Sequence, residues 1–113
     1  MDIELLKLFF PEGVLDIFTI STYKVQKDKL HFFLEENNDL PEEFKDQQAV
    51  SKGFLNEIII EDFPLRGKEV FLHVKRRRWT LKDTGEIIKR NWKLRAEGMK
   101  MTAEFADFLK GIS

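Results

Sequence analysis

Residues 68–81 constrain the fold most strongly, because they predict a long β-strand with one apolar face. Side chains alternate between the two faces of a strand, and the apolar residues of one face are Val70, Leu72 and Val74. The same strand then runs into Arg76, Arg77 and Arg78, which must also alternate between the faces. A ribbon that is charged on both sides cannot be buried there, so we expect this end to project from the sheet.

A tight turn at Asp83-Thr84-Gly85 predicts that the chain returns as the second strand of a hairpin over residues 68–93, because glycine fills a left-handed turn position at little cost. With a three-residue loop, Arg78 faces Arg90 across the hairpin, whereas with a four-residue loop it faces Lys89. Either register sets like charges opposite each other, which destabilises a ladder by tenths of a kcal/mol up to about 1 kcal/mol. A bound phosphate would reverse this repulsion.

The charges are distributed unevenly along the chain. Residues 1–65 carry six Lys and no Arg against fourteen Asp and Glu, for a net charge of 6 − 14 = −8. Residues 66–113 carry seven Lys and six Arg against six acids, for a net charge of 13 − 6 = +7. Such asymmetry indicates either a face that binds a polyanion, above all nucleic acid, or an acidic half that pairs with the basic half inside the fold.

The remaining patterns predict one α+β domain over residues 1–113, mainly an antiparallel sheet of hairpins with an N-terminal and a C-terminal helix. The expected elements are a core-docking or partner-binding helix at 1–10, hairpin strands at 14–26 and 30–35, an acidic loop with a helical turn at 36–53, a strand at 54–63 and a helix from Thr102. The last helix would present a narrow apolar stripe that ends at Leu109.

Several functional classes lack their signatures. The chain has no cysteine, which excludes disulfides, thiolate nucleophiles and cysteine-ligated zinc, and it has no phosphate-binding glycine loop. His31 and His73 fit ordinary strand positions, although His73 could donate to a phosphate. We therefore expect no enzyme activity, metal or cofactor. The longest apolar runs are about four residues, far short of a membrane span, and no signal peptide is visible, so we expect a cytoplasmic protein.

Basic residues interleaved with tryptophan predict a DNA-binding surface on the hairpin. Guanidinium groups bind phosphates bidentately and read guanine edges, and a two-stranded ribbon fits the major groove. The tryptophans would brace the ribbon or stack on bases. The candidate contacts are Arg66, Lys68, Lys75, Arg76, Arg77, Arg78, Trp79, Lys89, Arg90, Trp92, Lys93 and Arg95. If about five phosphates are neutralised, log K should fall against log salt with a slope of roughly −4 to −5.

The chain resembles the N-terminal region of insertion-sequence transposases of the ISAon type. The residues that carry the resemblance are the opening Met-Asp-Ile-Glu-Leu-Leu-Lys, the run from Ile60 to Trp79, the Asp-Thr-Gly turn, the Arg-Asn-Trp return and the Met-Thr-Ala-Glu-Phe-Ala ending. More distantly, Asp62-Phe63-Pro64, Gly67-Lys68 and Arg76 to Arg78 are similar to the zinc-ribbon domain of ISL-type transposases. Where those relatives have cysteines this chain has Leu81-Lys82-Asp83-Thr84-Gly85, so a zinc-free ribbon is expected.

This resemblance implies a non-catalytic role in transposition. The region would recognise the terminal repeats of a mobile element as double-stranded DNA, associated with the nucleoid when bound. A metal-dependent DDE catalytic domain would lie in a separate or downstream polypeptide and could be a partner. The alternative is a protein-interaction module that docks on the catalytic subunit or on a second copy as a homodimer, and an inactive relic is a third reading.

Overall fold

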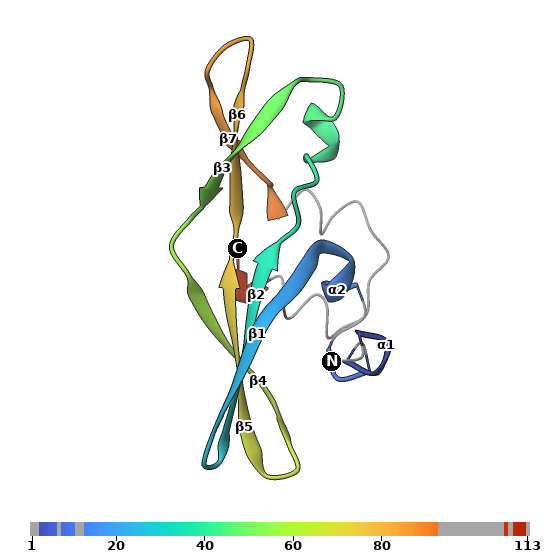
Figure 1. Cartoon of the computed structure of the whole chain (residues 1–113), viewed down its shortest axis with the longest axis vertical. Helices are drawn as coiled ribbons and strands as arrows, with labels where there is room; N and C mark the ends of the chain where they lie inside the picture. The colour runs from blue at the N-terminus through green and yellow to red at the C-terminus, as the bar shows by residue number, and fades with distance from the viewer. Residues whose placement is uncertain (1–2, 7, 11–12, 93–107, 109, 113) are drawn as a thin grey trace.

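The computed structural model describes residues 3–6, 8–10, 13–92, 108 and 110–112, and in these residues the protein is an elongated, mainly β structure. Figure 1 shows strands running along the length of the molecule, whose principal extents are 50 × 28 × 24 Å. The strands form two sheets, one of four strands and one of three, arranged end to end. The predicted α+β class with mainly antiparallel pairing is confirmed.

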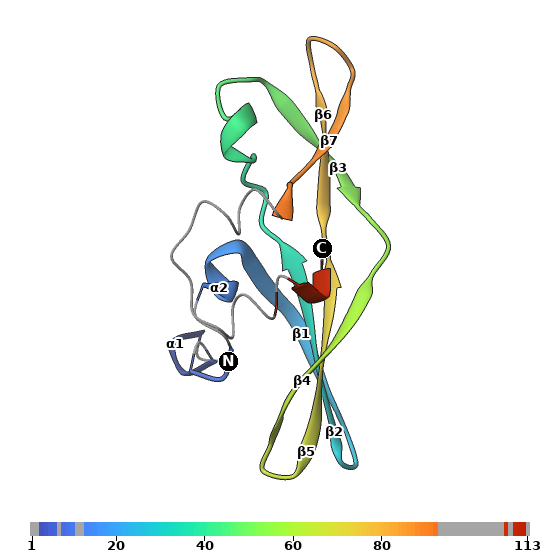
Figure 2. The ribbon, with the colours of Figure 1, turned by 180° about the vertical axis from the view of Figure 1, so that it is seen from behind.

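The larger sheet contains two hairpins that lie side by side. Strands β1 (Phe18–Gln26) and β2 (Lys29–Glu36) form one hairpin, and β4 (Ile58–Leu65) and β5 (Lys68–Lys75) form the other. The sheet order is β1-β2-β5-β4, so β2 and β5 meet as parallel strands in the middle. This parallel seam is not predicted from the sequence. It brings the turns of both hairpins to the same end of the molecule, as both views show (Figures 1 and 2).

The smaller sheet contains the basic hairpin. Its order is β3 (Ala49–Phe54), β6 (Arg77–Leu81) and β7 (Ile87–Lys89), all antiparallel. Arg78 lies opposite Lys89, which selects the four-residue loop. The loop is closed by hydrogen bonds of 2.8 Å from the amide of Gly85 to the carbonyl of Leu81 and from the amide of Leu81 to the carbonyl of Glu86. Gly85 has φ +75°, as its position predicts.

Two expectations about this region were wrong. The strand predicted over residues 68–81 is interrupted at Arg76 and divides between the two sheets. The loop predicted over residues 36–53 does contain the expected helical turn, η1 (Glu42–Phe44), but it also contains most of β3. Strand β3 opens with Ala49, Val50 and Ser51, which do not alternate clearly between apolar and polar side chains. The local sequence therefore does not distinguish this strand from a loop.

The main core lies on one face of the larger sheet. Helix α2 (Val14–Ile17), where the sequence favoured strand, covers this face together with Phe10, Trp92 and Phe108. The residues of the sheet that they bury include Phe32, Leu34, Val70, Leu72 and Val74. A second, smaller core under the three-stranded sheet consists of Trp79, Leu81 and Ile88, with Leu40, Phe44 and Ala49 packed against it. Both cores are therefore covered from the same side (Figure 1).

The terminal helices meet the expectations only in part. Helix α1 (Ile3–Leu6) is present, but the predicted docking of residues 1–10 on the core is wrong for three of its four described apolar side chains. Leu5 is 54% exposed and Leu8 is 78% exposed, and of this segment's described side chains only Phe10 is buried. The C-terminal helix predicted from Thr102, with its stripe ending at Leu109, lies outside the described residues except at positions 108 and 110–112, which are helical.

Candidate nucleic-acid interface

The arginine run lies at the junction of the two sheets. Strand β5 ends at Lys75 and β6 begins at Arg77, so Arg76 stands between two ladders. Its carbonyl accepts a hydrogen bond of 2.8 Å from the amide of Leu55, which links β3 and β4 in the chain. This contact satisfies the backbone at the break. Arg76 therefore lies between the two sheets, whereas Arg77 and Arg78 begin a strand of the smaller one.

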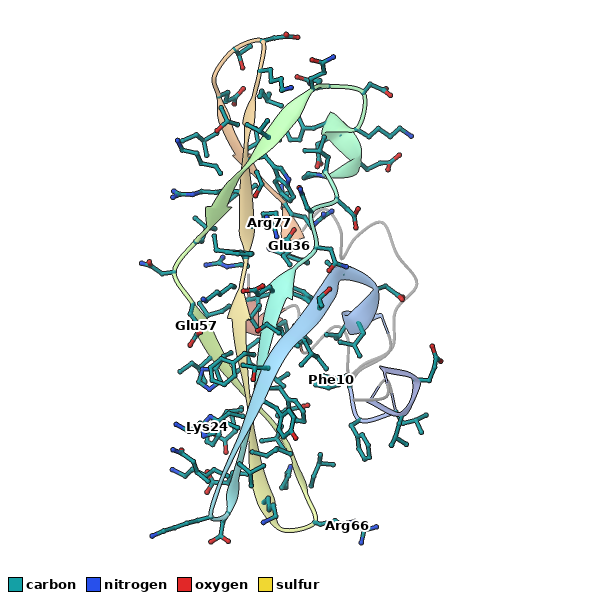
Figure 3. The ribbon with its side chains drawn as sticks, viewed as in Figure 1. Phe10, Lys24, Glu36, Glu57, Arg66 and Arg77 are labelled. Atoms are coloured by element: carbon teal, nitrogen blue, oxygen red, sulfur yellow. The ribbon has the colours of Figure 1, made fainter. Side chains whose placement is uncertain are left out.

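A buried carboxylate at this junction holds two of the arginines. Glu36, the last residue of β2, is fully buried, and its Oε2 accepts a hydrogen bond of 2.9 Å from Nε of Arg90. Its Oε1 accepts from the backbone amide of Arg77 at 3.0 Å, and its carbonyl accepts from Nε of Arg77 at 3.1 Å. Figure 3 shows Glu36 and Arg77 next to each other. Burial raises the pKa of Glu36, while the hydrogen bonds from Arg90 and Arg77 act in the opposite direction.

The expectation that the arginine run is not buried holds in part, because Arg76, Arg77 and Arg78 are all half-buried. Arg90 has a side chain that is only 10% exposed, and its Nη2 also donates to the carbonyl of Asp39 at 2.6 Å. Arg77 donates in addition to the hydroxyl of Ser51 and lies over the ring of Phe54 at 4.6 Å from its centroid. Both guanidinium groups therefore have internal acceptors. Among the described ion pairs, the acidic half of the chain pairs with the basic half at this point and between Glu57 and His73.

Three neighbouring cations lack such compensation. We define the cationic ridge as Arg76, Arg78 and Lys89. Arg78 and Lys89 lie directly opposite each other on β6 and β7, and Nε of Arg76 and of Arg78 is buried without an acceptor. The side chain of Arg76 donates once, from Nη1 to the carbonyl of Ile112 at 3.3 Å. Among the described residues, no carboxylate forms an ion pair with any member of the ridge.

A pocket of about 390 Å³ opens beside the ridge. Its cationic wall consists of Arg76, Arg77, Lys89 and Arg90, and its apolar wall consists of Leu55, Trp92 and Ile112. Four cations that face one concavity raise the local concentration of anions, because low-dielectric walls focus the field. The guanidinium groups can in addition bind an oxyanion through two parallel hydrogen bonds. The pocket therefore suits a phosphate group.

The two tryptophans brace the hairpin from inside. Trp79 is 1% exposed, and its Nε1 donates to Oδ1 of Asn38 at 2.8 Å. Trp92 is 6% exposed and stacks on Phe18 with an interplanar angle of 12°. Bases could not reach either ring face without unfolding these contacts. The burial of both rings argues against stacking on bases and fits the bracing role that was the other prediction for Trp79 and Trp92.

The other candidate contacts do not form one surface with the ridge. Arg66 and Lys68 lie at the turn of the β4/β5 hairpin, at the opposite end of the larger sheet (Figure 3). Lys75 is half-buried at the end of β5, where it precedes Arg76 of the ridge. Lys93 and Arg95 lie outside the described residues. The continuous basic surface predicted from the sequence is thus divided between the two ends of β5.

Sequence reasoning missed Glu36, although a signal for it exists. Alternation along β2 places Glu36 on the same face as Phe32 and Leu34, both of which are buried. A carboxylate that follows two buried positions in this pattern requires a cationic partner. The partners, however, come from residues more than forty positions away, so their identity depends on the fold.

Two histidines and a glutamate meet on the other face of the larger sheet. Nδ1 of His31 lies 2.8 Å from Nε2 of His73, whose Nδ1 lies 2.8 Å from Oε1 of Glu57. The parallel pairing of β2 and β5 brings the two histidines together. Burial, and then the charges of His73, Lys24 and Lys29, lower the pKa of His31. In the part of the chain that the structure describes, no group of three or more side chains suits a metal ion.

Comparison of the whole chain with protein-family models, with curated proteins and with solved structures gives no match. None of the described helices has the length and apolar character needed to span a bilayer. Inferences about function therefore depend on the charge and geometry of the chain's own residues, above all the cationic ridge and the pocket beside it.

Proposed function

We propose that the protein binds double-stranded DNA through the cationic ridge. In this proposal it is the non-catalytic N-terminal part of an insertion-sequence transposase, acts in the cytoplasm on the nucleoid, and recognises the terminal repeats of the element. A separately encoded or downstream DDE domain carries out catalysis. The observation that supports DNA binding best is the direct opposition of Arg78 and Lys89 beside a pocket with four cations.

The ridge has the properties expected of a phosphate site. Like charges that face each other across a ladder destabilise it, so the free protein carries a repulsion that a bound anion relieves. The buried Nε groups of Arg76 and Arg78 have no acceptor among the described residues, so no internal hydrogen bond to Nε holds either guanidinium group away from a phosphate. Glu36 neutralises part of the charge of Arg77 and Arg90 and holds them beside the pocket, so these two arginines support the ridge rather than extend it.

The strength of binding can be estimated from the number of available cations. With Arg77 and Arg90 engaged by Glu36, the ridge itself supplies three contacts instead of the five expected from the sequence. Each neutralised phosphate contributes about −0.9 to the slope of log K against log salt, so the ridge alone predicts a slope of roughly −3. Loss of one contact should weaken binding about eightfold at 0.1 M salt, which follows from the same slope.

The test compares Arg78→Gln with Lys45→Gln in a fluorescence anisotropy titration of duplex DNA. Both substitutions remove one positive charge, but Lys45 is exposed on the turn after η1, where it pairs with Glu42. We expect Arg78→Gln to weaken binding about eightfold at 0.1 M salt and Lys45→Gln to have little effect. Equal effects of the two substitutions, or no binding by the unchanged protein at low salt, would refute the proposal.

The alternative function, a protein-interaction module, has one observation in its favour. Leu5, Leu8 and Phe9 are exposed on the N-terminal segment, and apolar side chains grouped in this way occur at protein contacts. Sedimentation of the same variants separates the two functions. If Arg78→Gln abolishes self-association and leaves DNA binding unchanged, the ridge is a protein contact.

A further inference from the structure

A second group of cations lies at the far end of the larger sheet. Because β2 and β5 are parallel, the β1/β2 turn and the β4/β5 turn lie next to each other (Figures 1 and 2). Nζ of Lys68 donates to the carbonyl of Lys27 at 3.2 Å, and the amide of Glu69 donates to the carbonyl of Asp28 at 2.8 Å. These contacts join two turns that are about forty residues apart in the sequence.

The joined turns are rich in exposed positive charge. We define the tip cluster as Lys24, Lys27, Lys29, Arg66 and Lys68, all of which are exposed. The acids within residues 24–29 and 66–69 are Asp28 and Glu69, so these segments carry a net charge of 5 − 2 = +3. Three of the five cations come from the half of the chain that is acidic overall. The grouping of these five cations therefore cannot be predicted from the sequence, because the parallel pairing of β2 and β5 brings them together.

Two of these cations occupy strained backbone positions. Lys27 has φ +47° and Arg66 has φ +49°, and no other described residue except glycine has a positive φ. Glycine or asparagine adopts this conformation with less strain, whereas other side chains are disfavoured by roughly 1–2 kcal/mol. Stability of the turns alone would favour those smaller residues. The presence of a long cation at both tips therefore indicates that the charge serves a contact.

The distance between the tip cluster and the cationic ridge matches a repeat of DNA. Strands β5 and β6 run end to end along the long axis of the molecule (Figure 1). Arg78 follows Lys68 by ten positions, and at about 3.3 Å per extended residue this spacing corresponds to roughly 33 Å. One helical turn of B-DNA measures about 34–36 Å. Phosphates one turn apart on the same strand face the same side of the duplex.

We propose that the tip cluster is a second phosphate-binding site and that the protein lies along the duplex, bridging phosphates about one helical turn apart. This inference rests on the proposed function, because the ridge must contact DNA for a bridge to form. Exposed acids lie between the two sites, among them Glu57 and Glu61 (Figure 3 labels Glu57). Their charge confines the contacts to the two ends.

A length series of duplexes tests the bridge. A duplex of about 18 base pairs spans both sites, whereas a hairpin-closed duplex of about 8 base pairs spans only one. The variant Lys27→Asn/Arg66→Asn removes two tip charges and retains the turns, because asparagine tolerates positive φ. Lys45→Gln is the control for a charge change, and circular dichroism checks that each variant remains folded.

We expect the unchanged protein to bind the long duplex far more tightly than the short one after correction for the number of sites. The Asn variant should lose roughly sixtyfold in affinity for the long duplex at 0.1 M salt, and its salt slope should become shallower by about 2. Equal affinity for both lengths, or an Asn variant that behaves as Lys45→Gln does, overturns the bridge while leaving binding at the ridge intact. Absence of binding to either duplex refutes the proposed function itself.

Discussion

Replacement of Glu36 by glutamine should strengthen DNA binding, because the carboxylate competes with phosphate for the same arginines. In the folded protein Glu36 accepts hydrogen bonds from Nε of Arg90 and from the backbone of Arg77, and both side chains line the pocket beside the cationic ridge. Glutamine preserves the size and shape of the side chain and removes its negative charge. The positive charge of Arg77 and Arg90 then becomes available to a bound anion.

The expected gain can be calculated in two ways. If the substitution releases one arginine for one additional phosphate contact, affinity rises about eightfold at 0.1 M salt and the salt slope steepens by about 0.9. Alternatively, a carboxylate about 6 Å from a phosphate repels it by about 0.7 kcal/mol in water and about 2.8 kcal/mol at an effective dielectric constant near 20. An eightfold gain corresponds to about 1.2 kcal/mol, which lies between these limits.

The effect of the substitution on stability has two parts of opposite sign. Burial raises the pKa of Glu36, so the folded state tolerates its neutral form better than its charged form, relative to the unfolded chain. The contribution of this group is present below the unfolded value of 4.5 and is lost as pH rises through the folded pKa. Neutral glutamine keeps that contribution. It also leaves the charge of Arg90, whose side chain is 10% exposed, without its carboxylate partner. Loss of one partner of a buried ion pair costs about 3–5 kcal/mol, so we expect a net loss of stability, and circular dichroism must show that the variant remains folded.

The assay is an anisotropy titration with duplex DNA at several salt concentrations, with Glu43→Gln as the control. Glu43 is exposed on η1 and its substitution changes the net charge equally. Affinity of the unchanged protein should also rise as pH falls through the raised pKa of Glu36, and this rise should be absent from Glu36→Gln. Should folded Glu36→Gln bind DNA more weakly, or no differently from Glu43→Gln, the carboxylate orients the arginines instead of competing for them, and the reasoning fails.

Three further predictions concern the fold. Because the pKa of His31 is lowered in the folded protein, stability should fall as pH drops below about 6.5 through the folded pKa, and urea titrations of His31→Phe should lack this loss. Gly85→Ala should lower stability by about 1–2 kcal/mol in thermal denaturation, whereas Gly85→Asn should lower it less, because φ is +75° and no atom within 4 Å obstructs a Cβ. Trp79→Phe should lower stability by about 1–3 kcal/mol, because it leaves a cavity in the smaller core and removes the hydrogen bond to Asn38, yet it should leave the salt slope of DNA binding unchanged.

Local patterns predict the hairpins of this fold well and their assembly poorly. The turn at residues 27–28 follows from its charged, polar residues between apolar strands, and Gly85 marks the tip of the basic hairpin. Gly85 suits either loop length, however, so the pairing of Arg78 with Lys89 could not be chosen in advance. The parallel seam of β2 and β5 joins segments about forty residues apart, and no short-range pattern encodes such a contact.

In the candidate site, too, the sequence predicts the local features but not how they come together, and here the reason is electrostatic. Alternation placed Arg77 and Arg78 on opposite faces, which is what the structure has: one bonds to Glu36 and the other faces Lys89. The break at Arg76 could not be anticipated, because an arginine is compatible with a continuing strand. Nor could the neutralisation of Arg77, since it depends on Glu36, an acid that β2 brings to the junction. The sequence shows which residues are charged, but the packing of the strands decides which of these charges meet an opposite charge.

The two interpretations of the charge asymmetry therefore apply to different residues. The acidic half gives Glu36 to Arg77 and Arg90, and it also gives three lysines to the tip cluster, so the halves are interleaved in space. A positive charge stays unpaired where no carboxylate lies close to it in the fold. On that basis we propose the cationic ridge and the tip cluster as the surfaces that bind a polyanion within the described part of the chain, although the whole chain has a net charge of −1. Affinity for DNA should accordingly follow these two groups and respond little to exposed charges elsewhere.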